Sequence, residues 1–197
     1  IAAAGASTDN ASKKSDREKR APFSEKELTD IFGAEWFVDG VGKKTVKNTY
    51  LYYQPNYYWV PLLLAYSGAR CNEVCQLLVS DIRQSPAGIW YLDFNLDGPE
   101  KVDVQEDSEI KFDGKAFKTV NSLRVVPIHD HLIRLGLVDY VQVLKGKGHI
   151  YLFPDLRFDP MKGRGKCFGQ WFNERYLGRR LKIERDSTKT AYSFRHT

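Results

Sequence analysis

The sequence predicts a mainly α-helical domain with a small antiparallel β-sheet, which places the chain in the α+β class. Apolar residues recur at helical spacing in segments on both sides of the middle of the chain. In the middle, β-branched and aromatic residues gather in short runs bounded by turn residues. Since strands and helices do not alternate, the expected order is helices, a small sheet, then helices.

One main domain is expected from the length of the chain. A sequence of 197 residues that is 42% hydrophobic can bury one substantial core. Residues 1–20 lack periodic apolar positions and are rich in Ala, Ser, Lys and Asp, which is typical of a flexible linker or tail. The predicted domain therefore spans residues 21–197.

Composition also indicates the compartment. No apolar run approaches the length of a membrane span, and the first residues lack the basic region of a secretory signal. Three cysteines, an odd number, fit reduced thiols better than a disulfide framework. We therefore expect a cytoplasmic protein without a membrane partner.

The first helix is predicted in the segment PFSEKELTDIF. Ser24 is placed to cap its first turn, and Glu27 is placed to reach back to Ser24. Leu28, Ile31 and Phe32 then form the buried stripe.

Two further helices are predicted before the sheet. One runs through PNYYWVPLLLAYSG, where Pro61 kinks it or restarts its first turn and Gly68 ends it. The other is NEVCQLLVSDI, which places Val74, Leu77 and Leu78 on one face.

The sheet and the last helices follow from the remaining patterns. Strands are predicted in GIWYLDF and in SLRVVPIH. Helical spacing returns in HLIRLGLVDYVQVLKGKG and CFGQWFNERYLGRRL, which the turn-rich segment YLFPDLRFDPMKGRGK joins.

Charge is distributed unevenly along the chain, whose formal net charge is +5. Residues 161–195 hold ten Lys or Arg against three acids, whereas residues 97–113 hold seven acids against two lysines. A basic side of this kind is typical of proteins that bind nucleic acid. The alternative is that both stretches are solvated surface segments.

Three motifs carry a family resemblance. YSGARCNEVCQLLVSDI fits the pattern T-G-x-R-x-x-E-(x)2-x-L-x-x-x-D-I, with Ser67 in place of Thr. KTVNSLRVVPIH fits K-T-x-x-S-x-R-x-V-P, and YSFRHT fits H-x-x-R-H-T. In this order and spacing, the motifs resemble the catalytic domain of the tyrosine recombinases, the phage integrase family, over roughly residues 21–197.

The resemblance implies roles for five residues. Arg70 and Arg195 match the two catalytic arginines, and Lys118 matches the catalytic lysine on a β-hairpin. Glu73 matches the acid that follows the first arginine, and His196 matches the neighbour of the second.

The sequence departs from the family pattern in two ways. Tyr192 stands where H-x-x-R has its histidine, and the chain ends before the expected tyrosine nucleophile. We therefore expect a core that is incomplete at its carboxyl end and inactive in strand transfer as it stands. Tyr192 is predicted either to donate a hydrogen bond to phosphate or to be a core-edge tyrosine.

The chemistry explains the two arginines. Transfer of a DNA phosphodiester to a tyrosine passes through a phosphorane with extra negative charge on its nonbridging oxygens. A guanidinium suits this charge because it offers a planar fork of donors and stays protonated. The alternative for these arginines is an ordinary ion pair with Glu73 or Asp81.

The leaving 5′ oxygen needs a proton as its bond breaks. Lys118 is the predicted general acid, and Lys115 is its nearest alternative. The alternative role for either is that of a solvated loop lysine.

Neither a metal nor a cofactor is expected. The histidines lack the paired spacing of a zinc site, and Cys71 and Cys75 have only the distant Cys167 as a further thiol. The basic glycine-containing loops do not match a phosphate-binding loop.

The sequence thus predicts a bacterial or phage-encoded, nucleoid-associated enzyme for site-specific DNA recombination or integration through a 3′-phosphotyrosine intermediate. Its expected partners are double-stranded DNA and other recombinase protomers. The alternatives are a DNA-binding remnant or regulator without strand transfer, and a basic RNA-binding domain that stacks bases on aromatics of GIWYLDF. The predicted DNA-binding residues are Lys162, Arg164, Lys166, Arg179, Arg180 and Lys189.

Overall fold

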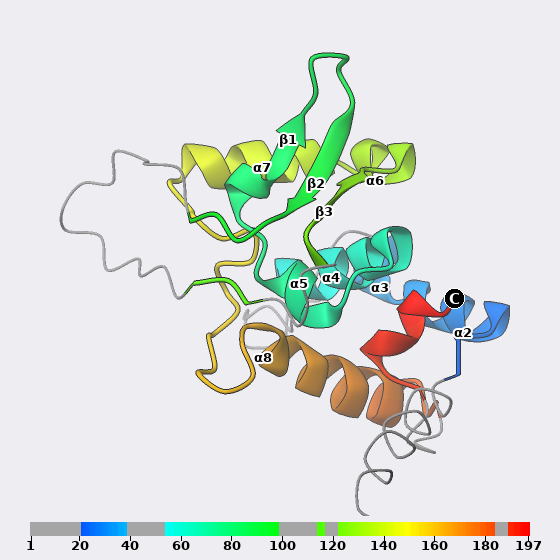
Figure 1. Ribbon diagram of the computed structural model, residues 1–197. Helices are drawn as coiled ribbons and strands as arrows, with labels where there is room; N and C mark the ends of the chain where they lie inside the picture. The colour runs from blue at the N-terminus through cyan, green and yellow to red at the C-terminus, as the bar shows by residue number, and fades with distance from the viewer. Residues whose placement is uncertain (1–20, 39–53, 99–113, 117–121, 184–188) are drawn as a thin grey trace, which may run out of the picture.

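The structure, a computed structural model, describes residues 21–38, 54–98, 114–116, 122–183 and 189–197. It is mainly α-helical with a three-stranded antiparallel sheet, as predicted. In Figure 1 the sheet lies with α6 and α7 in the upper part of the molecule, and α8 lies in the lower part, with α4 and α5 between them. Among the described residues, no helix is long and apolar enough to cross a membrane.

The chain enters the domain through α2 (Glu25–Phe32) and α3 (Glu35–Val38). The capping box predicted for α2 is present, because Glu27 N donates to Ser24 Oγ at 3.3 Å and Ser24 N donates to Glu27 Oε2 at 2.8 Å. Ile31 is fully buried, and Leu28 and Phe32 pack against the core, so the predicted apolar stripe is confirmed.

Helix α4 (Pro55–Ser67) is the central element, and its residues from Asn56 to Leu64 are buried. The helix starts at Pro55 and continues through Pro61, so Pro61 does not restart it. Gly68 ends the helix as predicted: it adopts the left-handed conformation, with φ of 60°, and its N–H donates to Leu64 O at 3.1 Å.

The third helix is shorter than the sequence predicts. Helix α5 (Cys71–Cys75) stops after five residues. The next residues pair with another segment instead: Leu152 N donates to Leu77 O, and Val79 N donates to Ile150 O, both at 2.9 Å. The helical pattern of Val74, Leu77 and Leu78 was misleading because this segment is buried on more than one side.

The sheet has the order β1-β2-β3 and is antiparallel throughout. The short helix η1 (Val79–Asp81) leads into β1 (Ile82–Gln84), a strand that the sequence did not predict. The strands β2 (Trp90–Phe94) and β3 (Arg124–Pro127) lie in the two predicted segments. In the register, Leu92 faces Ile82 on one side and Val126 on the other.

The carboxyl-terminal half is helical. The predicted helix after the sheet is divided into α6 (Asp130–Arg134) and α7 (Leu137–Gly146), because Gly136 adopts a φ of 88° between them. Helix α8 (Gly165–Gln170) continues into the π-type helix η3 (Trp171–Arg180). The described chain ends with the 3-10 helix η4 (Ala191–Arg195).

Phe194 ties η4 into the core. Its ring contacts Phe23, Phe32 and Phe172, with centroid distances of 4.9, 6.0 and 5.7 Å. The motif that contains Arg195 is thus fixed against both the start of the domain and η3.

A glycine-dependent contact joins α5 to the start of α8. Asn72 Oδ1 accepts a hydrogen bond from Gly165 N at 2.9 Å. Gly163 has a φ of 70°, and a Cβ atom there would lie 2.5 Å from Asn72 Oδ1. The backbone of this basic loop can therefore approach α5 only without side chains at these positions.

We expect Gly163→Ala to lower the free energy of unfolding by about 2 kcal/mol, because alanine is strained at positive φ and would also press on Asn72. Gly146→Ala is the control, since a Cβ at Gly146 meets no atom within 4 Å and φ there is not positive. Chemical denaturation measures both. Equal stability of the two variants would contradict the contact.

Candidate functional site

Arg70 lies at the junction of α4 and α5. After Gly68 turns the chain, Arg70 takes the N-cap position of α5 with an extended backbone. Glu73, three residues on, accepts Arg70 N at 3.0 Å on one carboxylate oxygen and Arg70 Nη1 at 2.6 Å on the other. The helix start therefore fixes both the backbone and the side chain of Arg70.

The second motif supplies two more partners from a distant part of the chain. Arg70 Nη1 donates to Ser122 Oγ at 2.8 Å, and Arg124 Nη2 donates to Glu73 Oε2 at 3.1 Å. Arg124 also lies over the ring of Phe94, 4.4 Å from its centroid. We call Arg70, Glu73, Ser122 and Arg124 the Glu73 cluster.

The carboxylate of Glu73 is the buried centre of this cluster. Its side chain is 3% exposed, whereas those of Arg70 and Arg124 are 24% and 28% exposed. Burial alone would raise the pKa of Glu73, but hydrogen bonds from Arg70 and Arg124 outweigh burial and hold the pKa below its usual value. The cluster thus holds one buried negative charge and two positive charges that reach toward solvent.

Arg70 keeps donors for a further ligand. The hydrogen bonds that Arg70 donates within the described part of the chain come from its backbone N and Nη1. Nε and Nη2 have no hydrogen-bond partner among the described residues. The ion pair with Glu73, the alternative role expected for this arginine, is therefore present and still leaves one edge of the guanidinium for an anion.

The third motif lies on η4. Thr190 caps this helix by accepting Tyr192 N at 3.2 Å, and Ala191 N donates to Asn173 Oδ1 of η3 at 2.8 Å. Tyr192 is half-buried with its ring 5.1 Å from that of His196, and Arg195 and His196 are exposed.

The two predicted arginines lie on neighbouring elements. Helix η4 packs against α4, whose end at Gly68 leads directly to Arg70. None of the hydrogen bonds of the Glu73 cluster given above comes from η4. The structure thus brings Arg70 and Glu73 together, and separately brings Tyr192 and His196 together.

Of Lys118 and Lys115, the two candidates for the general acid, the structure describes only Lys115. Lys118 lies outside the described residues. The side chain of Lys115 is only 1% exposed, and its Nζ donates to Asp81 Oδ1 at 2.8 Å and to Asn95 Oδ1 at 2.7 Å. Lys115 is thus held in a structural ion pair, and Asp81, the other alternative partner of Arg70, pairs with Lys115.

Asp81 has a structural role. Its Oδ2 accepts Leu78 N at 2.8 Å, which stabilises the turn that ends the α5 segment. Burial raises the pKa of Asp81, although the hydrogen bonds from Lys115 and Leu78 oppose this shift.

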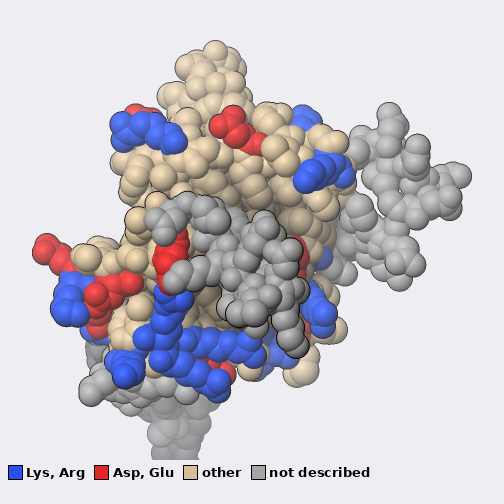
Figure 2. Space-filling view, turned by 180° about the vertical axis from the view of Figure 1, so that it is seen from behind, with Lys and Arg blue, Asp and Glu red and all other residues tan. Residues whose placement is uncertain are grey.

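All three predicted DNA-binding lysines line one hollow of about 760 Å³ beside α8, η3 and the start of η4. We call this the basic hollow, and its cations are Lys162, Lys166 and Lys189. Lys166 pairs with Asp159, and Lys189 pairs with Glu27 at 2.6 Å. Figure 2 shows Lys and Arg side chains gathered across the lower part of the face seen from behind.

The three predicted DNA-binding arginines lie elsewhere. Arg164 is buried, donates from Nη1 to Leu156 O at 2.6 Å and stacks on Tyr151, so its contacts stabilise the loop before α8. Arg180 is exposed and pairs with Glu35, and Arg179 is exposed at the end of η3.

Ser122 and Arg124 were missed as site residues by the sequence reasoning. The signal was available, because both are fixed letters of the K-T-x-x-S-x-R pattern that was used only to place Lys118. What the pattern could not show is that both letters contact the first motif.

The other expectations concern metals and RNA. Among the described residues, no group of three His, Cys, Asp or Glu side chains could hold a metal ion. The RNA-binding alternative needs exposed aromatics on the sheet, but Phe94 is buried and Trp90 and Tyr91 are only partly exposed.

Comparisons of the chain with protein-family models, with curated proteins and with solved structures found no match.

We expect Glu73→Gln to lower the free energy of unfolding by about 2 kcal/mol at pH 7, because two arginines lose their buried countercharge. The pKa of Glu73 is lowered by folding, so its stabilising effect is complete above its ordinary pKa and is lost as the pH falls through the lowered value. The difference from the wild type should therefore shrink in acid. Urea titrations at several pH values measure this.

Glu25→Gln is the matched control, because Glu25 is exposed in the first turn of α2. Its effect should stay within about 0.5 kcal/mol at pH 7. A Glu73→Gln effect that is equally small, or that does not depend on pH, would show that the ion pairs do not hold the site together.

Proposed function

We propose that this chain is the catalytic domain of a tyrosine recombinase of the phage integrase type, which cuts and rejoins DNA strands through a 3′-phosphotyrosine intermediate. One observation carries the proposal. The first two motifs, about fifty positions apart, supply the members of one cluster, since Arg70 and Glu73 come from the first and Ser122 and Arg124 from the second.

The contact between the two motifs is independent support for the family resemblance, because the resemblance was found from the sequence alone. A chance match of each motif would leave their fixed letters unrelated in space. Instead, the arginine, the acid, the serine and the second arginine join around one buried carboxylate. The small antiparallel sheet between helical segments is also what the resemblance implies for the fold.

In the proposed reaction, Arg70 binds a nonbridging oxygen of the scissile phosphate through the donors that Glu73 leaves open. Glu73 and Ser122 fix the guanidinium plane, so that little reorganisation is needed as negative charge develops. Arg195 is the second phosphate ligand, with His196 beside it. A tyrosine outside the 197 residues of this chain attacks the phosphorus and forms the 3′-phosphotyrosine bond, and Lys118 protonates the 5′ oxygen that leaves.

Tyr192 replaces the histidine of the family pattern. Its phenol can donate a hydrogen bond to a phosphate oxygen, but with an ordinary phenol pKa near 10 it accepts a proton poorly at neutral pH. We propose a donor role for Tyr192. The same replacement is the observation that favours the second candidate, a DNA-binding regulator without strand transfer.

In the proposed complex, DNA binds to the basic side of the domain. The basic hollow and the exposed cations of η3 supply phosphate contacts that position the duplex without reading its sequence. Since η4 begins at the rim of this hollow, with Thr190 in its lining, the DNA backbone lies close to the helix that contains Arg195.

In the natural protein at full length, we expect Arg70→Lys and Arg195→Lys each to reduce strand cleavage of a supercoiled plasmid by at least about 100-fold, because lysine keeps the charge but loses the planar fork. Binding to the same DNA should change by less than about fivefold. Arg134→Lys is the control, because Arg134 is exposed on α6.

Wild-type cleavage by either variant would remove that arginine from the proposed site. If the wild-type protein binds the DNA but forms no cleaved product, the regulator without strand transfer is the correct assignment.

For the chain described here, DNA binding should weaken steeply with salt. The variant with Lys162→Gln and Lys166→Gln should show a slope of log K against log salt that is smaller by up to about 2, since each lost phosphate contact removes about 0.9 from the slope. The variant with Lys145→Gln and Lys147→Gln removes the same charge from the last turn and C-cap of α7 and serves as the control. Equal slopes in the two variants would assign the lysines of the basic hollow to an ordinary solvated face.

A further inference from the structure

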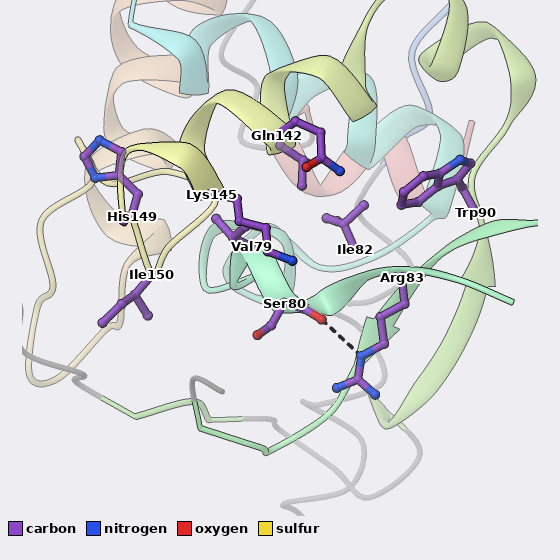
Figure 3. Close-up of a pocket in the computed structure, with 11 residues that line it drawn as sticks. Val79, Ser80, Ile82, Arg83, Trp90, Gln142, Lys145, His149 and Ile150 are labelled. Carbon is purple, nitrogen blue, oxygen red and sulfur yellow. Dashed lines mark hydrogen bonds between the residues drawn. The ribbon is translucent and has the colours of Figure 1, made fainter. Parts of the chain in front are cut away.

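A second cavity lies between the sheet and α7, and it contains none of the residues of the proposed reaction. Its volume is about 300 Å³, and its walls come from η1, β1, β2, α7 and the loop that follows α7 (Figure 3). This volume is at the lower end of the range for small-molecule sites.

The walls of this cavity are built from hydrogen-bonded backbone. Val79 and Ile150 line it from two segments that are joined by the bond from Val79 N to Ile150 O, 2.9 Å long. Ile82 and Trp90 line it from the paired strands β1 and β2. The cavity therefore belongs to the framework of the fold and does not depend on loop closure.

The inner surface of the cavity is apolar. Val79, Ile82, Val141 and Ile150 are all buried with their side chains in its lining. Trp90 is half-buried and lies at one end of the cavity in Figure 3, where its indole ring adds a flat apolar surface. A ring-sized apolar group would gain free energy by leaving water for this surface.

The rim of the cavity is cationic. Arg83, Lys145 and His149 line it, and no Asp or Glu is among its lining residues. Arg83 is already partnered, because it pairs with Asp93 at 3.2 Å and donates from Nε to Ser80 O at 3.0 Å. Lys145 is exposed, and in Figure 3 its ammonium group points between Ser80 and Ile82 toward the middle of the cavity.

We propose that this cavity binds a small carboxylate with a ring-sized apolar body. The body lies against Val79, Ile82 and Trp90, and the carboxylate meets the ammonium of Lys145. A monoanion is the matching charge, because Arg83 is already neutralised by Asp93 and leaves one lysine for the ligand. Ser80 and Gln142, also in the lining, offer hydrogen-bond donors beside this charge.

This site is independent of the proposed recombination reaction. The ligand contacts none of the residues of the Glu73 cluster, the basic hollow or η4. If the protein proves unable to cleave DNA, the proposal for this cavity still stands. If no carboxylate binds in the cavity, the recombinase assignment still stands.

The test uses 2-naphthoate as the probe and isothermal titration calorimetry of the chain as the measurement. We expect saturable binding with one site per chain. The uncharged 2-naphthalenemethanol should bind at least about tenfold more weakly, because it lacks the ion pair with Lys145.

The decisive variant is Lys145→Met, which keeps most of the apolar stem and removes the charge. It should weaken 2-naphthoate binding by about tenfold, the scale of one charge-assisted hydrogen bond. Lys147→Met is the matched control, because Lys147 is exposed at the end of the same helix but does not line the cavity. Its affinity should stay within about twofold of the wild type.

The apolar wall is tested by Trp90→Leu, with Ile89→Leu at the exposed neighbouring position as its control. Trp90→Leu should weaken binding of both naphthalene compounds, whereas Lys145→Met should affect the carboxylate alone. Lys145 is exposed, so its replacement remains informative even if Trp90→Leu does not fold.

Three results would overturn the proposal. One is the absence of saturable 2-naphthoate binding at millimolar concentration. The second is equal affinity of Lys145→Met and Lys147→Met. The third is binding of the peptide acetyl-Gly-Gly-Phe, with a free carboxyl end, that is at least tenfold tighter than that of 2-naphthoate, since this would assign the cavity to a peptide terminus.

Discussion

The buried carboxylate of Glu73 is the interaction on which the rest of the site depends. It joins the start of α5 to Arg124 of β3, and so connects the helical part of the domain to the sheet. A buried charge is costly without partners, and here two guanidiniums and a backbone N–H supply them. Because the carboxylate fixes Arg70 in place, the same contact stabilises the fold and orients the guanidinium.

Backbone geometry and core packing also help to position Arg70 and η4. Gly68 ends α4 so that Arg70 can begin α5. Gly163 and Gly165, at the start of α8, let the chain approach Asn72 of α5 closely. Phe194 fixes η4 between the first helix and η3, next to the basic hollow. Cationic groups therefore lie at the start of α5, where Arg70 is the N-cap residue, and in the basic hollow beside α8 and η3.

The sequence predicted the features that local chemistry determines. The Ser24 and Glu27 capping box, the end of α4 at Gly68 and two of the three strands lie where they were expected. The sequence-based prediction was wrong where backbone groups pair with a distant segment. Helix α5 is short because Leu152 N donates to Leu77 O, and the unpredicted strand β1 follows this paired segment. Burial of Arg164 and Lys115 was also hidden, since charge patterns along a chain do not show which cations are covered.

The proposed strand transfer is tested most directly by asking whether the natural protein at full length becomes covalently linked to DNA. A nicked suicide duplex traps the 3′-phosphotyrosine intermediate, because the cut fragment diffuses away and rejoining fails. The account predicts a protein–DNA band that resists SDS, is removed by protease and is absent in the Arg70→Lys variant. A protein that binds this duplex and forms no such band, or an Arg70→Lys variant that forms it as well as the wild type, would contradict the central claim.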